Sequence, residues 1–171
     1  MTKELWTNKK FTFTLENSEL ESILNRLREA PLKITRIVNG VSEEILNNKP
    51  KGKWSVKENI GHLIDLEELH YKRIDDFLEN RHVLHAADMR NKKTDAAHHN
   101  KKEINQLLNE FKKVREVFIN RIEKLDAEVL ERTSLHPRLN QPMRVIDLAQ
   151  FVSEHDDHHI ETIREIVINH Q

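Results

Sequence analysis

The sequence has no cysteine. This absence excludes a disulfide framework, a thiolate nucleophile and any zinc or iron–sulfur site with thiolate ligands. A metal ion would therefore have to be held by histidine and carboxylate side chains. Eleven histidines are available, and they are not grouped as a contiguous terminal tag.

Glycine and proline are also scarce, with three and four residues among 171, whereas a third of the chain is charged. This composition is typical of long amphipathic helices and argues against a β fold with many turns. The length suits one domain with one core. We therefore expect a single all-α domain over residues 1–171.

Neither sign of charge is in excess, because 28 Lys and Arg face 29 Asp and Glu, for a formal net charge of -1. A chain without positive excess has little to attract a phosphate backbone or an anionic membrane. It also has no apolar segment typical of a signal peptide or a membrane span. We expect a cytoplasmic protein that binds neither nucleic acid nor membranes.

Apolar residues recur with a helical period in four stretches of the chain. The predicted helices cover about residues 18–40, 55–80, 100–125 and 144–169. The connections 41–53 and 81–99 are long, and two prolines indicate a loop at 136–142. The sequence therefore predicts a four-helix bundle with long connections after the first and second helices.

Serine or asparagine followed three residues later by glutamate is typical of a capping box at a helix start. The pattern begins at Ser18, Ser55 and Asn100, where we expect the first three helices to open. Pro31 lies inside the first helical pattern and removes one backbone donor. It predicts a kink or two abutting helices.

Two histidines continue the inner stripe of the last predicted helix. His155 and His159 fall in register between the apolar residues before and after them. An i, i+4 pair projects two imidazoles from one face, a spacing that lets both reach one metal ion. Taken alone, such a pair is also common as a hydrogen-bonded or surface pair, so the residues leave both interpretations open.

A third ligand is available from His62 in the second predicted helix, next to Gly61, which permits a close approach of another helix. Periodicity places His62 away from the main apolar stripe, so a partly exposed histidine is the alternative. Four acids near the three histidines could orient the ligands or shuttle protons, or could belong to a solvated surface, namely Glu58, Asp65, Glu154 and Asp156. We assign no general base.

The stretch from Lys53 to Glu67, KWSVKENIGHLIDLE, and the later stretch HDDHHI from His155 to Ile160 resemble the DinB/YfiT-like family of metal-dependent enzymes. The resemblance extends over nearly the whole chain. It implies a four-helix bundle, commonly dimeric, with one nickel or zinc ion bound by a histidine of the second helix and an H-x-x-x-H pair of the fourth. Matched to this sequence, these ligands are His62, His155 and His159.

Three protein ligands leave an open position on a metal ion, as in catalytic sites. We expect an enzyme that activates water, or a low-molecular-weight thiol as the resemblance implies, for hydrolysis or S-transfer on a small molecule. The alternatives are a noncatalytic metal-binding protein, related to stress or dimerisation, and a metal-free helical adaptor. Trp54 is expected to anchor the core, and His158 to be a bystander beside His159. Four histidines of the second long connection could contact substrate or simply belong to a polar surface, namely His82, His85, His98 and His99.

Overall fold

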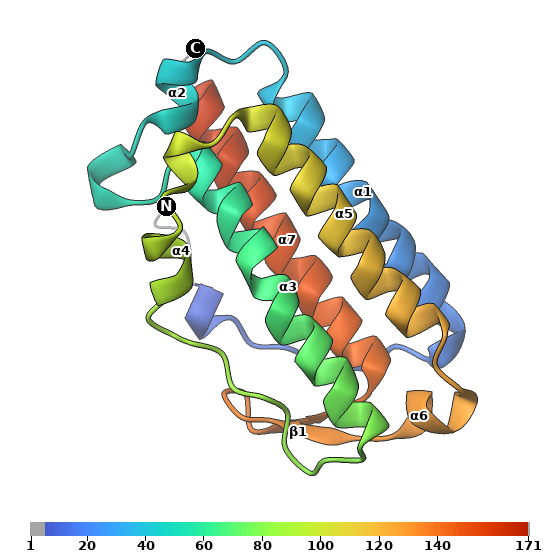
Figure 1. Ribbon diagram of the computed structural model, residues 1–171. Coiled ribbons are helices and arrows are strands. Elements are labelled where there is room, and N and C mark those ends of the chain that lie inside the picture. The colour runs from blue at the N-terminus through green and yellow to red at the C-terminus, as the bar shows by residue number, and fades with distance from the viewer. Residues whose placement is uncertain (1–5, 171) are drawn as a thin grey trace.

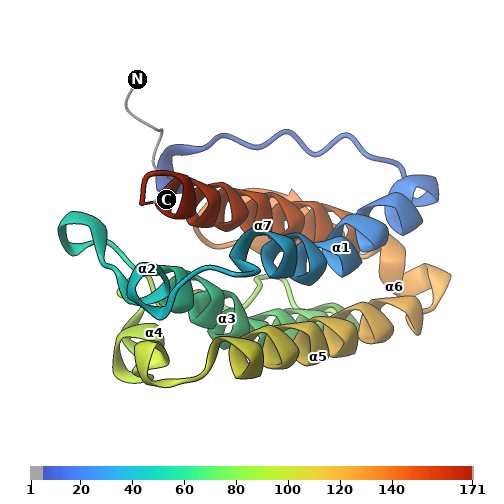
Figure 2. The same cartoon turned by 90° about the horizontal axis from the view of Figure 1, so that it is seen from above.

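Four long helices pack side by side as a bundle (Figure 1). The structure is a computed structural model that describes residues 6–170, and the four helices are α1 (Leu20–Val38), α3 (Val56–Leu78), α5 (Ile104–Glu123) and α7 (Val145–Ile168). Around the bundle the order is α1, α7, α3, α5. Figures 1 and 2 show that α1 and α7 run in one direction and α3 and α5 in the other. The predicted four-helix bundle is confirmed.

Only one of the three predicted capping boxes is present. Ser55 Oγ accepts the Glu58 N–H at 3.1 Å, and the Glu58 carboxylate accepts the Ser55 N–H at 2.9 Å. The prediction for Ser18 is wrong, because a 3₁₀ turn (Asn17–Glu19) precedes α1. The prediction for Asn100 is also wrong: its amide oxygen accepts the Ser55 hydroxyl proton at 2.6 Å, so Asn100 ties the loop to the start of α3.

Pro31 does not divide the first helix, because α1 continues through it from Leu20 to Val38. The expectation of two abutting helices is therefore wrong. Pro31 is buried in the bundle, and burial of its ring offsets the loss of one backbone hydrogen bond.

The connections contain short regular elements: α2 (Glu43–Asn47), α4 (Lys92–Ala96), α6 (Ala127–Glu131), β1 (Ser134–His136) and β2 (Gln141–Met143), with 3₁₀ turns at Trp6–Asn8, Pro50–Gly52 and His99–Lys101. β1 and β2 form an antiparallel hairpin where the sequence predicts a loop. Leu135 faces Pro142 but exchanges its backbone hydrogen bonds with His82 and Leu84. The missing N–H of Pro142 therefore breaks no bond of the hairpin.

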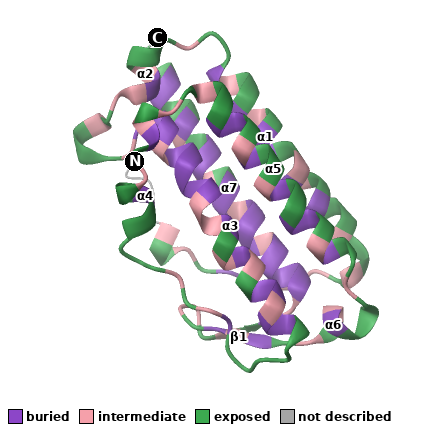
Figure 3. Cartoon of the chain, in the orientation of Figure 1, coloured by how far each residue is buried: buried purple, intermediate pink, exposed green. Residues whose placement is uncertain are grey.

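The inner faces of the four helices are buried (Figure 3), but the apolar core is interrupted near its middle. One apolar cluster lies around Leu27, Phe77 and Phe118, and a second lies around Ile34 and Phe111. Between them lies a buried ion cluster, in which Arg115 contacts two carboxylates at 2.8 Å each, those of Glu67 and Asp156. Among residues 6–170, no helix is long and apolar enough to cross a bilayer.

Candidate metal centre

The three histidines singled out in the sequence converge between α3 and α7. His62, His155 and His159 each offer one ring nitrogen, and these three atoms lie within 4.8 Å of one another. The Nε2 atoms of His155 and His159 are 3.2 Å apart. Two nitrogens bound to one tetrahedral zinc ion at about 2.0–2.1 Å would be about 3.3 Å apart. The pair therefore already has the spacing that shared ligation needs.

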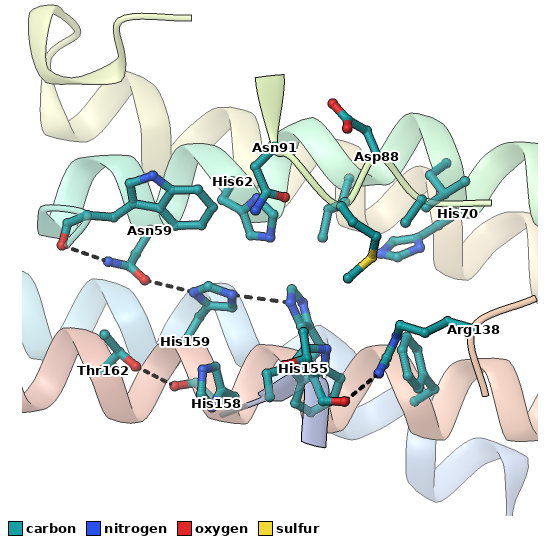
Figure 4. A pocket seen from close by; sticks show the side chains of 18 of the residues that line it. Asn59, His62, His70, Asp88, Asn91, Arg138, His155, His158, His159 and Thr162 are labelled. Atoms are coloured by element: carbon teal, nitrogen blue, oxygen red, sulfur yellow. Dashed lines mark hydrogen bonds between the residues drawn. The ribbon is translucent and has the colours of Figure 1, made fainter. Parts of the chain in front are cut away.

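Asn59 fixes the orientation and the tautomer of His159. The Asn59 amide nitrogen donates to the carbonyl of Ser55 at 2.8 Å, which directs its amide oxygen toward the ring. That oxygen lies 2.8 Å from His159 Nδ1, so the proton of the neutral ring is on Nδ1 (Figure 4). His159 Nε2 then presents its lone pair to the centre, as a metal ligand must.

His62 is held from the opposite side by Thr94 of α4. His62 Nδ1 lies 3.2 Å from the Thr94 hydroxyl. This hydroxyl also bonds the Asp65 carboxylate, which can only accept, so the hydroxyl donates to Asp65 and accepts from His62. His62 Nε2 is thereby left unprotonated and available to a metal ion.

The Thr94 segment is docked on α3 through Gly61. A Cβ atom at position 61 would lie 2.1 Å from the ring of His99, so only glycine leaves room for this ring. His99 Nε2 lies 2.8 Å from the Asp65 carboxylate. Burial alone would raise the pKa of Asp65, but the bonds from His99 and Thr94 outweigh it and lower the pKa. The expectation that another helix packs closely at Gly61 is therefore wrong, because the ring of His99 fills the space that the glycine leaves.

Two tryptophans form apolar walls around the imidazoles. The Trp54 ring lies 4.6 Å from the His62 ring, and the Trp6 ring lies 4.9 Å from the His155 ring, measured between centroids. Burial lowers the pKa of His62 to about 4 and the pKa of His155 well below its ordinary value. Both rings are therefore neutral at pH 7, the form that binds metal ions.

The imidazoles form part of the wall of a cavity of about 750 Å³. The other walls come from α3, α7, the hairpin and the return segment between α3 and α4. A volume of this size accommodates a small organic molecule.

The sequence profile of the DinB superfamily matches residues 26–163, a span that contains all three histidines. The chain belongs to the DinB superfamily. The solved structure of YfiT from Bacillus subtilis is similar over 92% of this chain and 91% of that chain, with a TM-score of 0.77 and 19% sequence identity. YfiT is described as a probable metal-dependent hydrolase with an unusual four-helix bundle topology, and at this identity the similarity shows a shared fold. No curated protein matches the chain.

Of the four acids considered in this DinB-superfamily chain, Asp65 alone contacts a residue that holds a ligand ring. Glu58 caps α3 and pairs with Lys49 at 2.8 Å. Glu154 pairs with Lys9 at 2.7 Å, on the outer side of α7. Asp156 belongs to the buried ion cluster with Arg115. Asp65 is thus a positioning residue, whereas the other three acids have structural partners.

The remaining histidines of this DinB-superfamily chain have different surroundings. His82 and His98 are exposed and do not line the cavity. His85 Nδ1 lies 2.7 Å from the Asp76 carboxylate. His158 lines the cavity beside Trp6, with 5.8 Å between the ring centroids. Of the loop histidines, only His99 supports the centre, through Asp65.

Sequence reasoning missed two residues of the centre, Asn59 and Thr94. Asn59 could have been found, because it lies three residues before His62 on the same helix. Thr94 had no signal, because its contact with His62 spans 32 residues and depends on how the return segment folds.

Proposed function

We propose that this protein is an enzyme in which His62, His155 and His159 hold one divalent metal ion that acts on a small molecule. The observation behind this proposal is the convergence of three buried imidazoles on the wall of a cavity large enough for a substrate. Asn59 and Thr94 leave the Nε2 atoms of His159 and His62 without a proton, the form in which they can bind a metal ion. Membership of the DinB superfamily supports the same conclusion.

A divalent ion at this centre would supply Lewis acidity, which activates water for hydrolysis or a low-molecular-weight thiol for S-transfer. The chain supplies the surroundings. Asn59 and Thr94 hold two of the rings, while Trp6 and Trp54 keep bulk water from the imidazoles. Because the chain has no cysteine, a nucleophilic thiol would have to come from a co-substrate.

Metal content tests the ligand set. Wild-type protein loaded with nickel or zinc and then desalted should retain one ion per chain by elemental analysis. His155→Ala should retain well under one, whereas His82→Ala, which changes an exposed histidine away from the cavity, should match the wild type. Full stoichiometry in His155→Ala would remove that residue from the ligand set.

The thiol reaction is tested by incubating metal-loaded protein with a chlorinated aromatic electrophile and bacillithiol, mycothiol or glutathione in turn. Metal-dependent conjugation with one of them, absent in His155→Ala, would support S-transfer. Absence of turnover with all three thiols would contradict the hypothesis of S-transfer. Hydrolysis would then be the remaining hypothesis, to be assayed with ester and amide substrates.

The cavity favours an enzyme over the noncatalytic metal-binding protein considered as the alternative, since a purely structural ion needs no space beside it. The homodimer implied by the family resemblance is tested by light scattering. If the protein binds metal and dimerises but turns over no substrate in any of these assays, the noncatalytic alternative replaces the enzyme.

A further inference from the structure

The cavity has a second polar end, opposite His62 and His159. Its wall there contains His70 and Arg73 of α3, His136 of β1, and Arg138 of the hairpin turn. Figure 4 shows His155 between the two ends, with His62 and His159 on one side and His70 and Arg138 on the other. None of these four residues belongs to the proposed metal centre.

The two arginines at this end have no carboxylate partner among residues 6–170. Arg73 is 2% exposed and donates Nε to the carbonyl of His85 at 3.0 Å. Arg138 donates Nη1 to the carbonyl of Thr7 at 3.1 Å, and its Nη2 is buried with no hydrogen-bond partner in the described part of the chain. Asp76, whose charge raises the pKa of Arg73, contacts His85 and Arg81 instead. A carbonyl satisfies a donor but does not neutralise a cation.

Arg115 shows how the same bundle treats another buried arginine. It contacts two carboxylates, and although burial by itself lowers its pKa, these carboxylates outweigh burial and raise it. At the polar end of the cavity, no carboxylate of the described residues outweighs the effect of burial on the arginine pKa values. Burial lowers the pKa of Arg138, and it lowers the pKa of Arg73 to about 10. Within residues 6–170 no carboxylate contacts either guanidinium, and the charge of Asp76 only partly offsets the effect of burial on Arg73.

His136 adds an uncharged donor at this end. His136 Nδ1 accepts the Leu139 N–H at 3.2 Å, so the proton of the neutral ring is on Nε2, which is buried without a partner in residues 6–170. Burial lowers the pKa of His136 to about 3, and the charges of Arg73 and Arg138 add to this effect. His136 and Arg138 also pack on the same ring, that of Phe151.

An oxyanion is the ligand that fits these donors. Guanidinium groups pair with carboxylates and phosphates through two parallel N–H bonds, and a neutral imidazole N–H adds a third donor. Asp88 also lines the cavity, but its carboxylate accepts the backbone N–H groups of Arg90 and Lys92. In Figure 4 it points away from the imidazoles.

We propose that Arg73, His136 and Arg138 form a subsite for the carboxylate or phosphate group of a small substrate, whose reacting part extends to the three-histidine centre. The statement about the reacting part rests on the proposed function. The anion subsite itself does not require the metal ion, so the two can be tested separately.

The test is isothermal titration calorimetry of the full chain after chelator treatment, so that no added anion can bind to a metal ion. Sodium phosphate and sodium succinate are titrated in separate experiments at low ionic strength. We expect saturable binding of at least one anion to the wild type, and at least tenfold weaker binding to Arg138→Gln. Arg138→Lys, which keeps the charge but loses the two-pronged geometry, should lie between them.

Arg164→Gln is the matched control, because it removes the same charge from an exposed arginine that pairs with Glu161. It should bind both anions like the wild type. Thermal melting by circular dichroism identifies variants that fold, and Arg73→Gln serves as the second variant if Arg138→Gln unfolds. The anion that binds more tightly identifies the group that the subsite prefers.

Equal affinity in wild type and Arg138→Gln, an equal loss in Arg164→Gln, or no saturable binding of either anion would overturn the subsite. If His155→Ala retains its full metal content while anion binding still depends on Arg138, the proposed ligand set fails and the subsite stands. If metal binds through the three histidines and no anion binds, the proposed function stands and the subsite fails.

Discussion

Replacing Gly61 with alanine should displace the segment that holds His62. The new Cβ atom would lie 2.1 Å from Cγ and 2.2 Å from Cδ2 of His99, a ring that is 1% exposed and cannot swing into solvent without unpacking. Overpacking costs about 1–3 kcal/mol, and loss of the bond from His99 to the Asp65 carboxylate costs about 1.5–3 kcal/mol. Replacing glycine with alanine inside a helix increases the free energy of unfolding by about 1 kcal/mol through helix propensity. We therefore expect Gly61→Ala to lower the free energy of unfolding by about 3 kcal/mol.

The measurement is urea unfolding of metal-free protein followed by circular dichroism. The control is the same substitution in a His99→Ala background, where the ring that causes the clash is gone. There Gly61→Ala should stabilise the protein by up to about 1 kcal/mol through helix propensity alone. If it destabilises the His99→Ala background as much as the wild type, the clash with His99 is not the cause and the reasoning is refuted.

Three further predictions concern the buried polar groups. Arg115→Met leaves both carboxylates of the buried ion cluster unpaired and should cost about 3–5 kcal/mol in urea unfolding, whereas replacing all three members with apolar residues should recover most of it. Asn59→Ala removes the partner of His159 Nδ1 and should weaken metal binding about 10–100-fold in competition with a chromophoric chelator. Burial, with the two neighbouring arginines, lowers the pKa of His136 to about 3, so below pH about 6.5 the unfolded chain binds a proton that the folded chain does not. Stability should therefore fall as the pH drops from 6.5 toward 3, and His136→Gln should lose less in urea titrations at pH 7 and pH 4.5.

The four long helices could be predicted from the sequence because each buries a stripe that repeats over several turns. The predicted helix at 144–169 matches α7, Val145–Ile168, almost residue for residue. The hairpin at 134–143 could not be predicted, because its prolines are local signals for a loop. What permits Pro142 there is the pairing of Leu135 with a segment about 50 residues earlier, which no local pattern contains.

Helical periodicity was sufficient to predict that His155 and His159 lie on the inner face of their helix, but it did not predict that His62 is buried. α3 is buried on opposite sides, with one face against the core and another toward the cavity. Periodicity detects the apolar face alone, so it left His62 as a partly exposed histidine, and the family resemblance identified it instead. Its 6% exposure shows that a cavity wall can bury a residue as completely as a core does.

Arg73 and Arg138 illustrate a different limit of prediction from sequence. Within a helical pattern or a loop, an arginine is typical of a solvated surface, and nothing in the neighbouring residues marks Arg73 as buried or Arg138 as half-buried. That no carboxylate from residues 6–170 pairs with them is a property of the folded chain, visible only when the hairpin and α3 are placed around one cavity.

The topology of the bundle explains why the centre has a cover. α3 and α5 are parallel neighbours, so the chain leaving the end of α3 must return along the bundle before α5 can begin (Figure 1). This return, residues 79–103, supplies a cavity wall around Met89 and brings Thr94 to His62. If α3 and α5 were antiparallel, a short turn could join them, and His62 would have neither its hydrogen-bond partner nor a wall facing it. The long connection therefore supplies what α3 and α7 alone lack, namely a cavity wall opposite the histidines and a hydrogen-bond partner for His62.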